Sequence, residues 1–364
     1  ARVRVEQARD LLRVRAGARC RSGGTTLDLA VTVRGPLPAA EDRVRFLFVM
    51  DPANTMLPDK DTSFAFMRGA RALGHDCWHC LPAELSSEGR HLSVHARPIA
   101  VSDTPPHVLL GEPADLSVEG GFDAVFIRKD PPFDDAYLHL TQQLDLVAGR
   151  TLVLNRPQGL RDANEKLFAL RFAHLMPRTL VTAEPARILA FLEEIGGRAV
   201  LKPLDGAGGR GVVALTLGDP NVRALIDLLT AEGRRLAMVQ QYLPAIVGGD
   251  KRVLLLDGEV LGAIRRVPRA DELRANIHVG GRVEATDLDA AERQLLAEVG
   301  PVLREHGLHF VGLDLIDGKL IEVNVTSPTG LQEMGRLAAR PLERDVIRWV
   351  EARVGELRGP VAST

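Results

Sequence analysis

The clearest pattern in the chain is a set of short, nearly continuous apolar runs, which are typical of buried parallel strands. The first covers residues 44–50, and two more cover residues 124–127 and 151–154. Between the first two runs, Asp61 can cap a helix that ends near Gly74. Strands that alternate with helices at this spacing predict a doubly wound α/β domain in the first part of the chain.

Polar residues follow each of these runs directly. Asp51 follows the first, Arg128-Lys129-Asp130 the second, and Asn155 the third. Open α/β sheets bind ligands outside the carboxyl ends of their strands, so we expect a ligand site near these residues.

The pattern changes from about residue 166. A strand at 200–203 leads into a glycine-rich stretch at 205–211. Two hairpins follow, each marked by Asp-Gly between apolar runs: residues 252–256 with 259–267, and residues 310–316 with 319–325. Antiparallel hairpins mixed with helices predict an α+β second part.

Length and charge limit the function classes. The 364 residues predict two or three structural units at roughly 100–200 residues per domain. Lys and Arg total 46 against 48 Asp and Glu, a net charge of -2, which indicates neither nucleic acid nor an anionic membrane as a partner. There is no apolar run of about 18 residues, and the arginine-rich N-terminus has no apolar core of a secretory signal.

The 3 cysteines are Cys20, Cys77 and Cys80. Cys77-Trp78-His79-Cys80 matches a redox motif or half a zinc site, but no second Cys/His pair follows at finger spacing. The surrounding residues instead predict a short strand. This cysteine usage suits a reducing compartment, so we expect a cytoplasmic protein.

The glycine-rich stretch has two interpretations. Glycines let backbone N–H groups approach a phosphate closely, but turns also collect glycine, and neither a Walker A nor a G-x-G-x-x-G motif is present. Lys202, just before the stretch, favours phosphate binding. Lys166 is a second cation, although alone it looks like a helix-surface lysine. Residues 240–243 could read an adenine edge or simply end a strand.

The second hairpin carries the strongest metal signal. Mg²⁺ prefers oxygen ligands, and Glu322 and Asn324, two residues apart, share one strand face. A strict two-residue Asp-Gly turn would put Asp314 on the opposite face. We predict instead a three-residue loop with Gly318 as a G1 bulge, which pairs residue 314 with 320 and brings all three side chains together. The alternative is an acidic hairpin facing solvent.

A basic stretch at residues 265–282 also has two interpretations. It could be a solvated loop, or a lid that places guanidinium groups on carboxylates and on a transferring phosphoryl group. No G-x-S-x-G motif or triad-like set occurs, so the sequence does not support a covalent hydrolase.

Taken in order, these segments resemble the bacterial glutathione synthetase family from about residue 45 to 355. The resemblance is carried by these segments: 49–52, 128–134, 155–157, 160–162, 164–168, 201–206, 242–245, 249–253, 310–314 and 322–328. It implies an α/β doubly wound N-terminal domain followed by an α+β ATP-grasp domain of two subdomains. The implied boundaries are 44–164 and 165–355, with a lid subdomain at about 178–245 and an N-terminal extension at 1–43.

The resemblance also implies a reaction, in which ATP drives the joining of γ-glutamylcysteine and glycine through an acylphosphate. The implied catalytic residues are Arg266 and Arg274. The implied ATP-binding residues are Lys166, Lys202, Gly206, Gly208, Gly209, Gly211, Gln240, Gln241, Tyr242 and Leu243. The implied substrate-binding residues are Asp51, Arg128, Lys129, Asp130, Asn276 and Arg282. The implied ligands of Mg²⁺ are Asp314, Glu322 and Asn324.

Further implied features are two Mg²⁺ ions, with Mn²⁺ as a substitute, and a homotetramer. Arg210 and the lid segment 277–279 differ from the pattern expected of the family's commonest members. Two alternative functions are another ATP-grasp carboxylate–amine ligase, and a non-catalytic nucleotide-binding module of the synapsin-like kind.

Overall fold

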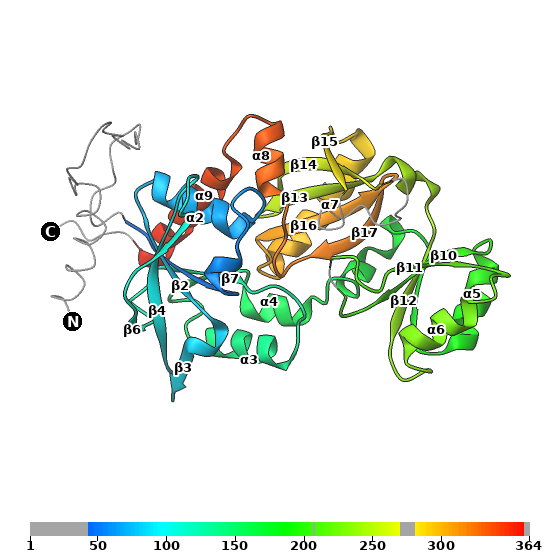
Figure 1. The fold of residues 1–364 in the computed structure, drawn as a ribbon, viewed down its shortest axis with the longest axis horizontal. Helices are drawn as coiled ribbons and strands as arrows, with labels where there is room; N and C mark the ends of the chain where they lie inside the picture. Colours follow the sequence, from blue (N-terminus) through cyan, green and yellow to red (C-terminus); the bar gives the residue numbers. More distant parts are fainter. Residues whose placement is uncertain (1–42, 207, 270–280, 360–364) are drawn as a thin grey trace, which may run out of the picture.

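The computed structural model describes residues 43–206, 208–269 and 281–359. Three sheets follow one another along the chain, and Figure 1 shows them side by side along the long axis of the molecule. The N-terminal sheet lies at one end, the sheet of β9–β12 at the other, and the sheet of β13–β17 between them.

The N-terminal sheet has the strand order β3-β4-β2-β1-β7-β8, and β5 and β6 also pair with β4. Its strands are β1 (Arg45–Met50), β2 (Asp76–Cys80), β3 (Leu85–Glu88), β4 (His91–Val101), β5 (Val108–Leu110), β6 (Ala114–Ser117), β7 (Ala124–Arg128) and β8 (Leu152–Leu154). The strands β2, β1, β7 and β8 are parallel, whereas β4 runs antiparallel to β2. The predicted parallel core is therefore confirmed, with an antiparallel extension at one edge.

Helices cover both faces of this sheet. They are α2 (Thr62–Ala72), α3 (Asp135–Leu144), α4 (Pro157–Asp162) and α9 (Leu342–Arg358). Phe46 and Phe48 of β1 belong to the same buried cluster as α2 and α9, whereas Leu47 and Val49 belong to the cluster of α3 and α4. Asp61 caps α2 as predicted, because its side chain accepts from the Ser63 N–H. The last helix of the chain thus completes the core of the first domain.

The second sheet is antiparallel, in the order β11-β10-β12-β9. Its strands are β9 (Thr179–Thr182), β10 (Arg198–Pro203), β11 (Val213–Thr216) and β12 (Ala237–Gln241). Two amphipathic helices pack on one face: α5 (Pro185–Glu194) and α6 (Val222–Thr230). The glycine-rich stretch is the loop of the β10–β11 hairpin, so both of its interpretations start from the same local structure.

The third sheet has the order β15-β14-β13-β16-β17 and is also antiparallel. Its strands are β13 (Asp250–Leu256), β14 (Glu259–Val267), β15 (Arg282–Ala285), β16 (Phe310–Ile316) and β17 (Lys319–Asn324). The helices beside it are α7 (Ala290–Glu305) and α8 (Leu331–Leu337). Val253, Leu255 and Leu313 pack in one cluster with α7, so the alternate residues of β13 and β16 point to the other face.

Short 3₁₀ helices join these elements: η2 (Ala53–Thr55), η3 (Pro82–Glu84), η4 (Phe168–Leu175) and η5 (Pro244–Gly248). Asn155, just after β8, connects the first and third sheets. Its Nδ2 donates to the carbonyls of Phe310 (2.9 Å) and Val325 (2.8 Å), and its Oδ1 accepts from the Phe310 N–H (2.8 Å). Asn155 therefore holds the two sheets together and does not line the ligand pocket.

Cys77 and Cys80 are buried on β2 and belong to different clusters on the two faces of the sheet. Burial raises the pKa of both thiols. The strand-packing interpretation of this segment is confirmed.

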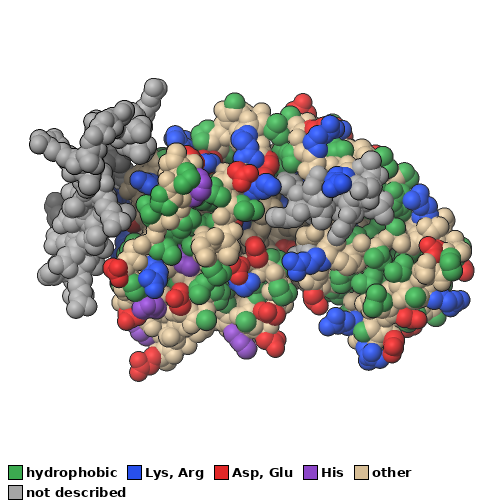
Figure 2. All heavy atoms as spheres, viewed as in Figure 1, with side chains coloured by type: hydrophobic (Ala, Val, Ile, Leu, Met, Phe, Trp, Pro, Cys, Tyr) green, Lys and Arg blue, Asp and Glu red, His purple; other side chains and the backbone are tan. Residues whose placement is uncertain are grey.

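Over the described ranges, no helix is both long and apolar enough to cross a membrane. Figure 2 shows acidic and basic side chains interspersed on one face of the molecule.

Candidate active site

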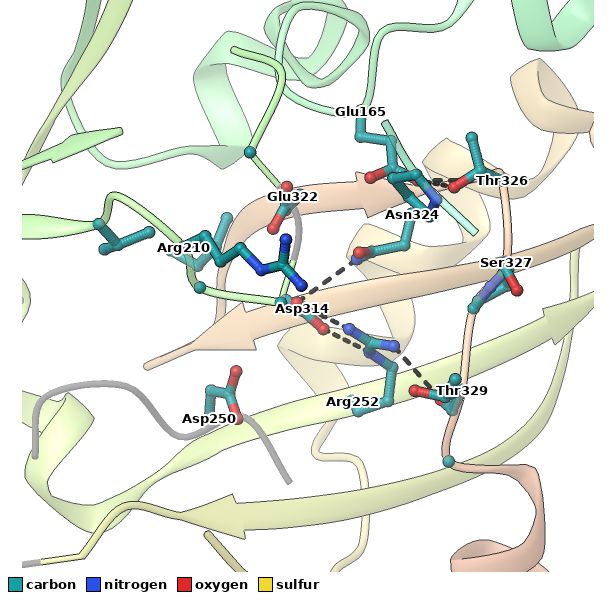
Figure 3. A pocket seen from close by; sticks show the side chains of 18 of the residues that line it. Glu165, Arg210, Asp250, Arg252, Asp314, Glu322, Asn324, Thr326, Ser327 and Thr329 are labelled. Atoms are coloured by element: carbon teal, nitrogen blue, oxygen red, sulfur yellow. Dashed lines mark hydrogen bonds and ion pairs between the residues drawn. The ribbon is translucent and has the colours of Figure 1, made fainter. Parts of the chain in front are cut away.

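A cavity of about 700 Å³ lies where the three sheets meet. It is lined from the N-terminal domain by residues such as Asp51 and Arg128, from the β10–β11 hairpin by its glycine-rich loop, and from the central sheet by β13–β17. A volume of this size suits a substantial small-molecule ligand. Figure 3 shows the side chains of the central sheet pointing into it.

The β16–β17 hairpin presents Asp314, Glu322 and Asn324 on one face. Asp314 lies directly opposite Glu322, and Asn324 lies opposite Gly312. The predicted common face is confirmed, but the predicted loop is wrong. The turn is a two-residue Asp317-Gly318 turn with positive φ at both positions (51° and 67°), and residue 314 does not pair with residue 320. The register shifts farther from the turn than predicted, between Asp314 and Leu315, which leaves Ile321 rather than Gly318 as the extra residue.

Asp314 is buried and receives two guanidinium groups. Arg252 donates from Nε to its Oδ1 (2.6 Å) and from Nη2 to its Oδ2 (3.1 Å), and Arg266 Nη2 lies 3.0 Å from Oδ1. Burial alone would raise the pKa of Asp314, but the two arginines hold that pKa well below its usual range. Asp314 is therefore a fixed anion.

Arg266 also pairs with Asp250, which faces it across β13 and β14. Arg266 Nε donates to Asp250 Oδ1 at 2.9 Å. Burial alone would lower the pKa of Arg266, but the carboxylates of Asp314 and Asp250 raise it above its usual value. Because Arg266 is shared by two carboxylates, it stays charged and is held in one orientation in the pocket.

Lys166 lies in a turn before η4 and is buried, so the comparison with a helix-surface lysine is wrong. Its Nζ lies 2.9 Å from Glu322 Oε1 and donates to the carbonyl of Gly206 at 2.7 Å. Lys166 thereby links the acidic hairpin to the glycine-rich loop. The burial arises because β17 packs against this segment, where the Val323 N–H donates to the carbonyl of Glu165.

Lys202 is buried at the end of β10, and its Nζ donates to Gln240 Oε1 at 2.7 Å. No carboxylate of the described residues lies within 4.0 Å of it, and burial lowers its pKa. A buried ammonium without an acidic partner suits an anionic ligand. Gln240, Gln241, Tyr242 and Leu243 line the same cavity, as do Gly206, Gly208 and Gly209, whereas Gly211 does not.

On the N-terminal side, Arg128 is buried and lines the cavity. It donates to Ser63 Oγ (3.0 Å) and to the carbonyl of Pro328 (3.2 Å), and its guanidinium lies 5.7 Å from the Phe66 ring centre. Burial lowers its pKa, and among the described residues no carboxylate lies within 4.0 Å. Arg128 is therefore suited to pair with a carboxylate of a ligand.

The other residues predicted on this side differ in position. Asp51 and Asp130 line the cavity, whereas Lys129 pairs with Asp51 at 3.1 Å and lies outside the lining. Arg282 is exposed and pairs with Glu284 at 2.6 Å, so the structure does not bring it into the site. Arg274 and Asn276 lie outside the described residues.

Glu165, Asp250 and Arg252 also line the cavity, although the sequence did not indicate a role for them. Glu165 Oε1 accepts from the Val325 N–H (3.0 Å) and from Thr326 Oγ1 (2.9 Å), while burial and then the nearby Glu322 raise its pKa. The spacing of Asp250 and Arg252 would place both on one strand face, but the predicted strand began at residue 252, whereas β13 begins at Asp250.

The oxygen donors of Asp314, Glu322 and Asn324 form a set that Mg²⁺ takes, since this ion is held through one or two carboxylates plus phosphates. Within the described ranges, no group of three or more His, Cys, Asp or Glu side chains that could hold a metal gathers. The two carboxylates and one amide of the hairpin therefore fit the ion only together with oxygens from a ligand.

Comparisons with known proteins agree on the family. Residues 44–161 match the model of the prokaryotic glutathione synthetase N-terminal domain, and residues 165–339 match that of its ATP-grasp domain. The glutathione synthetase of Prochlorococcus marinus (strain MIT 9313) is 47% identical over 306 residues, 84% of this chain and 97% of that protein. The glutathione synthetase of Bradyrhizobium diazoefficiens is 41% identical over 84% of this chain and 96% of that protein.

Solved structures with the same fold are more distant in sequence. D-cycloserine synthetase DcsG has a TM-score of 0.59 at 16% identity and covers 85% of this chain and 100% of its own. The ATP-grasp ligase PsnB has a TM-score of 0.55 at 19% identity, over 86% of this chain and 99% of its own. The fold is thus that of ATP-grasp ligases, and with the two domain matches in order the chain belongs to the prokaryotic glutathione synthetase family.

Proposed function

We propose that this protein is an ATP-dependent ligase that joins γ-glutamylcysteine to glycine, giving glutathione, ADP and phosphate. The observation that carries the proposal is the arrangement of Asp314 and Glu322 on one hairpin face, with Lys166 and Lys202 at the same cavity. Carboxylates and lysines converging on one cavity suit a triphosphate and its counter-ion.

We assign nucleotide binding to the glycine-rich loop, the two lysines and residues 240–243. Lys202 and Lys166 would pair with phosphate oxygens, and Gly206, Gly208 and Gly209 would let the loop approach them. Gly211 would serve the shape of the loop. Tyr242 is held by the Arg198 guanidinium, 4.0 Å from its ring centre, which orders the segment assigned to adenine.

We assign Asp314, Glu322 and Asn324 as the residues that would hold Mg²⁺. Two ions would bind there, and Mn²⁺ could replace Mg²⁺. When bound, the ion offsets the charge of the phosphates. Arg252 and Arg266 keep Asp314 ionised and fix its orientation, so this carboxylate needs no reorganisation when a ligand arrives.

In the first chemical step, a carboxylate oxygen of the dipeptide attacks the γ-phosphorus. An O–P bond forms, and the bond between the γ-phosphorus and the β,γ-bridging oxygen breaks. ADP leaves with that oxygen and the electron pair of the broken bond. Arg266 would neutralise charge on the transferring group. In the second step, the amine of glycine attacks the acyl carbon, phosphate leaves with its electron pair, and one amine proton passes to the phosphate.

We place the dipeptide on the N-terminal side of the cavity. Arg128 would bind one of its carboxylates, with Asp51 and Asp130 near its ammonium group. Arg274 and Asn276 lie outside the described residues; by family membership, Arg274 would take part in catalysis and Asn276 would bind the dipeptide. Lys129 would act through its ion pair with Asp51.

The test is phosphate release from ATP that requires both γ-glutamylcysteine and glycine, with glutathione identified by mass spectrometry. We expect no release when either is omitted. Release with a different pair of amino compounds would contradict the substrate assignment and support another ligase of this fold. Absence of release with any pair would instead support a nucleotide-binding module.

We further propose a homotetramer in the cytoplasm and take residues 44–164 and 165–355 as the two domains, with 178–245 as the lid subdomain. Helix α9 falls in the second range by sequence but packs on the sheet of the first domain. These proposals are supported by family membership and by the cysteine content. Light scattering after gel filtration measures the oligomeric state, and a monomer would contradict the tetramer.

A further inference from the structure

Arg210 lies in the glycine-rich loop between β10 and β11 and lines the main cavity. Figure 3 shows its side chain extending from the loop toward Asp314 and Glu322 on the central sheet. A cation on the loop therefore faces the two carboxylates of the hairpin across the cavity.

The conformation of the loop backbone fixes the position of the Arg210 main chain. A Cβ on Gly206 would lie 2.9 Å from the carbonyl oxygen of Arg210, so the two arms of the loop approach this closely only because residue 206 is glycine. Gly211 has a φ of +70°, and a Cβ there would lie 3.0 Å from Pro203 Cγ. These two glycines hold residue 210 at the base of the loop, with its side chain directed into the cavity.

Three of the neighbouring cations are already paired with carboxylates. Arg252 and Arg266 bind Asp314, and Lys166 binds Glu322 at 2.9 Å. Arg210 has no carboxylate of the described residues within 4.0 Å, although it points toward two of them. The space between this guanidinium and the carboxylates can hold an anionic ligand. Oxygens of that ligand would bind the guanidinium on one side and, through a bound cation, the carboxylates on the other.

We propose that Arg210 is a catalytic residue that binds the γ-phosphate of ATP through two N–H groups and stays on it during transfer. This inference rests on the proposed function and adds a residue to it. As the bond from phosphorus to the β,γ-bridging oxygen breaks and the substrate carboxylate bonds to phosphorus, negative charge spreads over the transferred oxygens. The planar guanidinium can pair with two of those oxygens through two parallel N–H bonds, a fixed geometry that an ammonium group lacks.

The experiment compares Arg210→Ala and Arg210→Lys with the unsubstituted protein in the full ligation assay. The matched control is Arg234→Ala, which removes an exposed arginine of the same subdomain that pairs with Glu232 and lies outside the cavity. We expect Arg210→Ala to lower kcat by about 100-fold, since loss of one charge-stabilising donor has this effect. KM for γ-glutamylcysteine and for glycine should not change, and Arg234→Ala should behave as the unsubstituted protein.

A second measurement separates catalysis from loop shape. Guanidinium ion added to Arg210→Ala should restore part of kcat, and Arg210→Lys should retain intermediate activity with a smaller response. A kcat of Arg210→Ala within about threefold of the unsubstituted value, or a loss that guanidinium does not restore, would overturn the proposal. If the unsubstituted protein itself lacks glycine-dependent phosphate release, the proposed function has failed instead, so the two failures are distinguished.

Discussion

Arg252 and Asp314 lie directly opposite each other on β13 and β16, and the guanidinium of Arg252 donates to both carboxylate oxygens of Asp314. Both side chains are buried, with 6% and 8% of their surface exposed. A buried carboxylate that accepts from a two-pronged donor is held in a single rotamer. Figure 3 shows the two side chains joined by hydrogen bonds on the central sheet, and both line the cavity, so the proposed metal ligand is oriented before any ligand binds.

Replacing Arg252 with Met should reduce both stability and activity. Removal of one partner leaves a buried charge with less compensation, for which we expect about 3 kcal/mol of lost stability. Since Asp314 also loses its orientation, kcat should fall by at least about 10-fold. Urea unfolding and the coupled assay measure the two effects.

The matched control for that variant is Arg265→Met, on the same sheet but outside the cavity. It should change stability by less than about 1 kcal/mol. Equal effects of the two substitutions would show that the Arg252–Asp314 pair has no special importance.

Lowering the pH should reduce the free energy of unfolding through protonation of Asp314. The pKa of Asp314 is lower in the folded than in the unfolded protein, so its contribution to stability is complete above the unfolded pKa of about 3.9 and is lost as the pH falls further. The difference in unfolding free energy between the unsubstituted protein and Asp314→Asn should therefore be constant from neutral pH to about pH 5 and shrink below about pH 4. A difference that grows on acidification would reverse the assigned sign.

Lys202→Met should separate stability from nucleotide binding. Burial lowers the pKa of Lys202, which means that the folded state disfavours its charge at neutral pH. Loss of the charge should therefore leave the melting temperature of the ligand-free protein undiminished, while the rise in melting temperature on adding MgATP should disappear. Thermal denaturation with and without nucleotide measures both.

Lys319→Met serves as the comparison for Lys202, because Lys319 is an exposed lysine of β17. It should keep the full MgATP-induced rise. If Lys202→Met kept that rise as well, Lys202 would have no direct role at the phosphates.

Glu322→Gln should abolish phosphate release without unfolding the protein. The substitution keeps the shape of the side chain but removes a charge that pairs with Lys166 and is proposed to bind Mg²⁺. We expect kcat to fall by at least about 100-fold. The same assay on Asp317→Asn, at the exposed tip of the same hairpin, should give unchanged activity, since asparagine tolerates positive φ. A Glu322→Gln protein that is folded and fully active would remove this carboxylate from the mechanism.

The order and type of the elements around the site follow from local sequence. Continuous apolar runs predict β1, β7 and β8, and the two Asp-Gly pairs predict both hairpins, because these signals depend on neighbouring residues alone. The common face of Asp314, Glu322 and Asn324 was also predictable. Three oxygen-bearing side chains between apolar neighbours suggest one shared site, and a single irregular step in the register brings them to the same face. The position of that step was not predictable, because a bulge at Gly318 in the turn and one at Ile321 within β17 both bring the three side chains to the same face.

Contacts between distant segments were decided by the tertiary structure. Arg252 and Asp314 are 62 residues apart, and Lys166 and Glu322 are 156 apart, so no local pattern shows that they pair. The burial of Lys166, the bridging role of Asn155 and the packing of α9 on the first sheet depend likewise on which surfaces meet. The sequence by itself determined which chemical groups the chain offers at each strand end and turn. Packing of the three sheets decided which of those groups share one cavity, because the hydrophobic contacts that bring them together are non-directional and join residues far apart in the sequence.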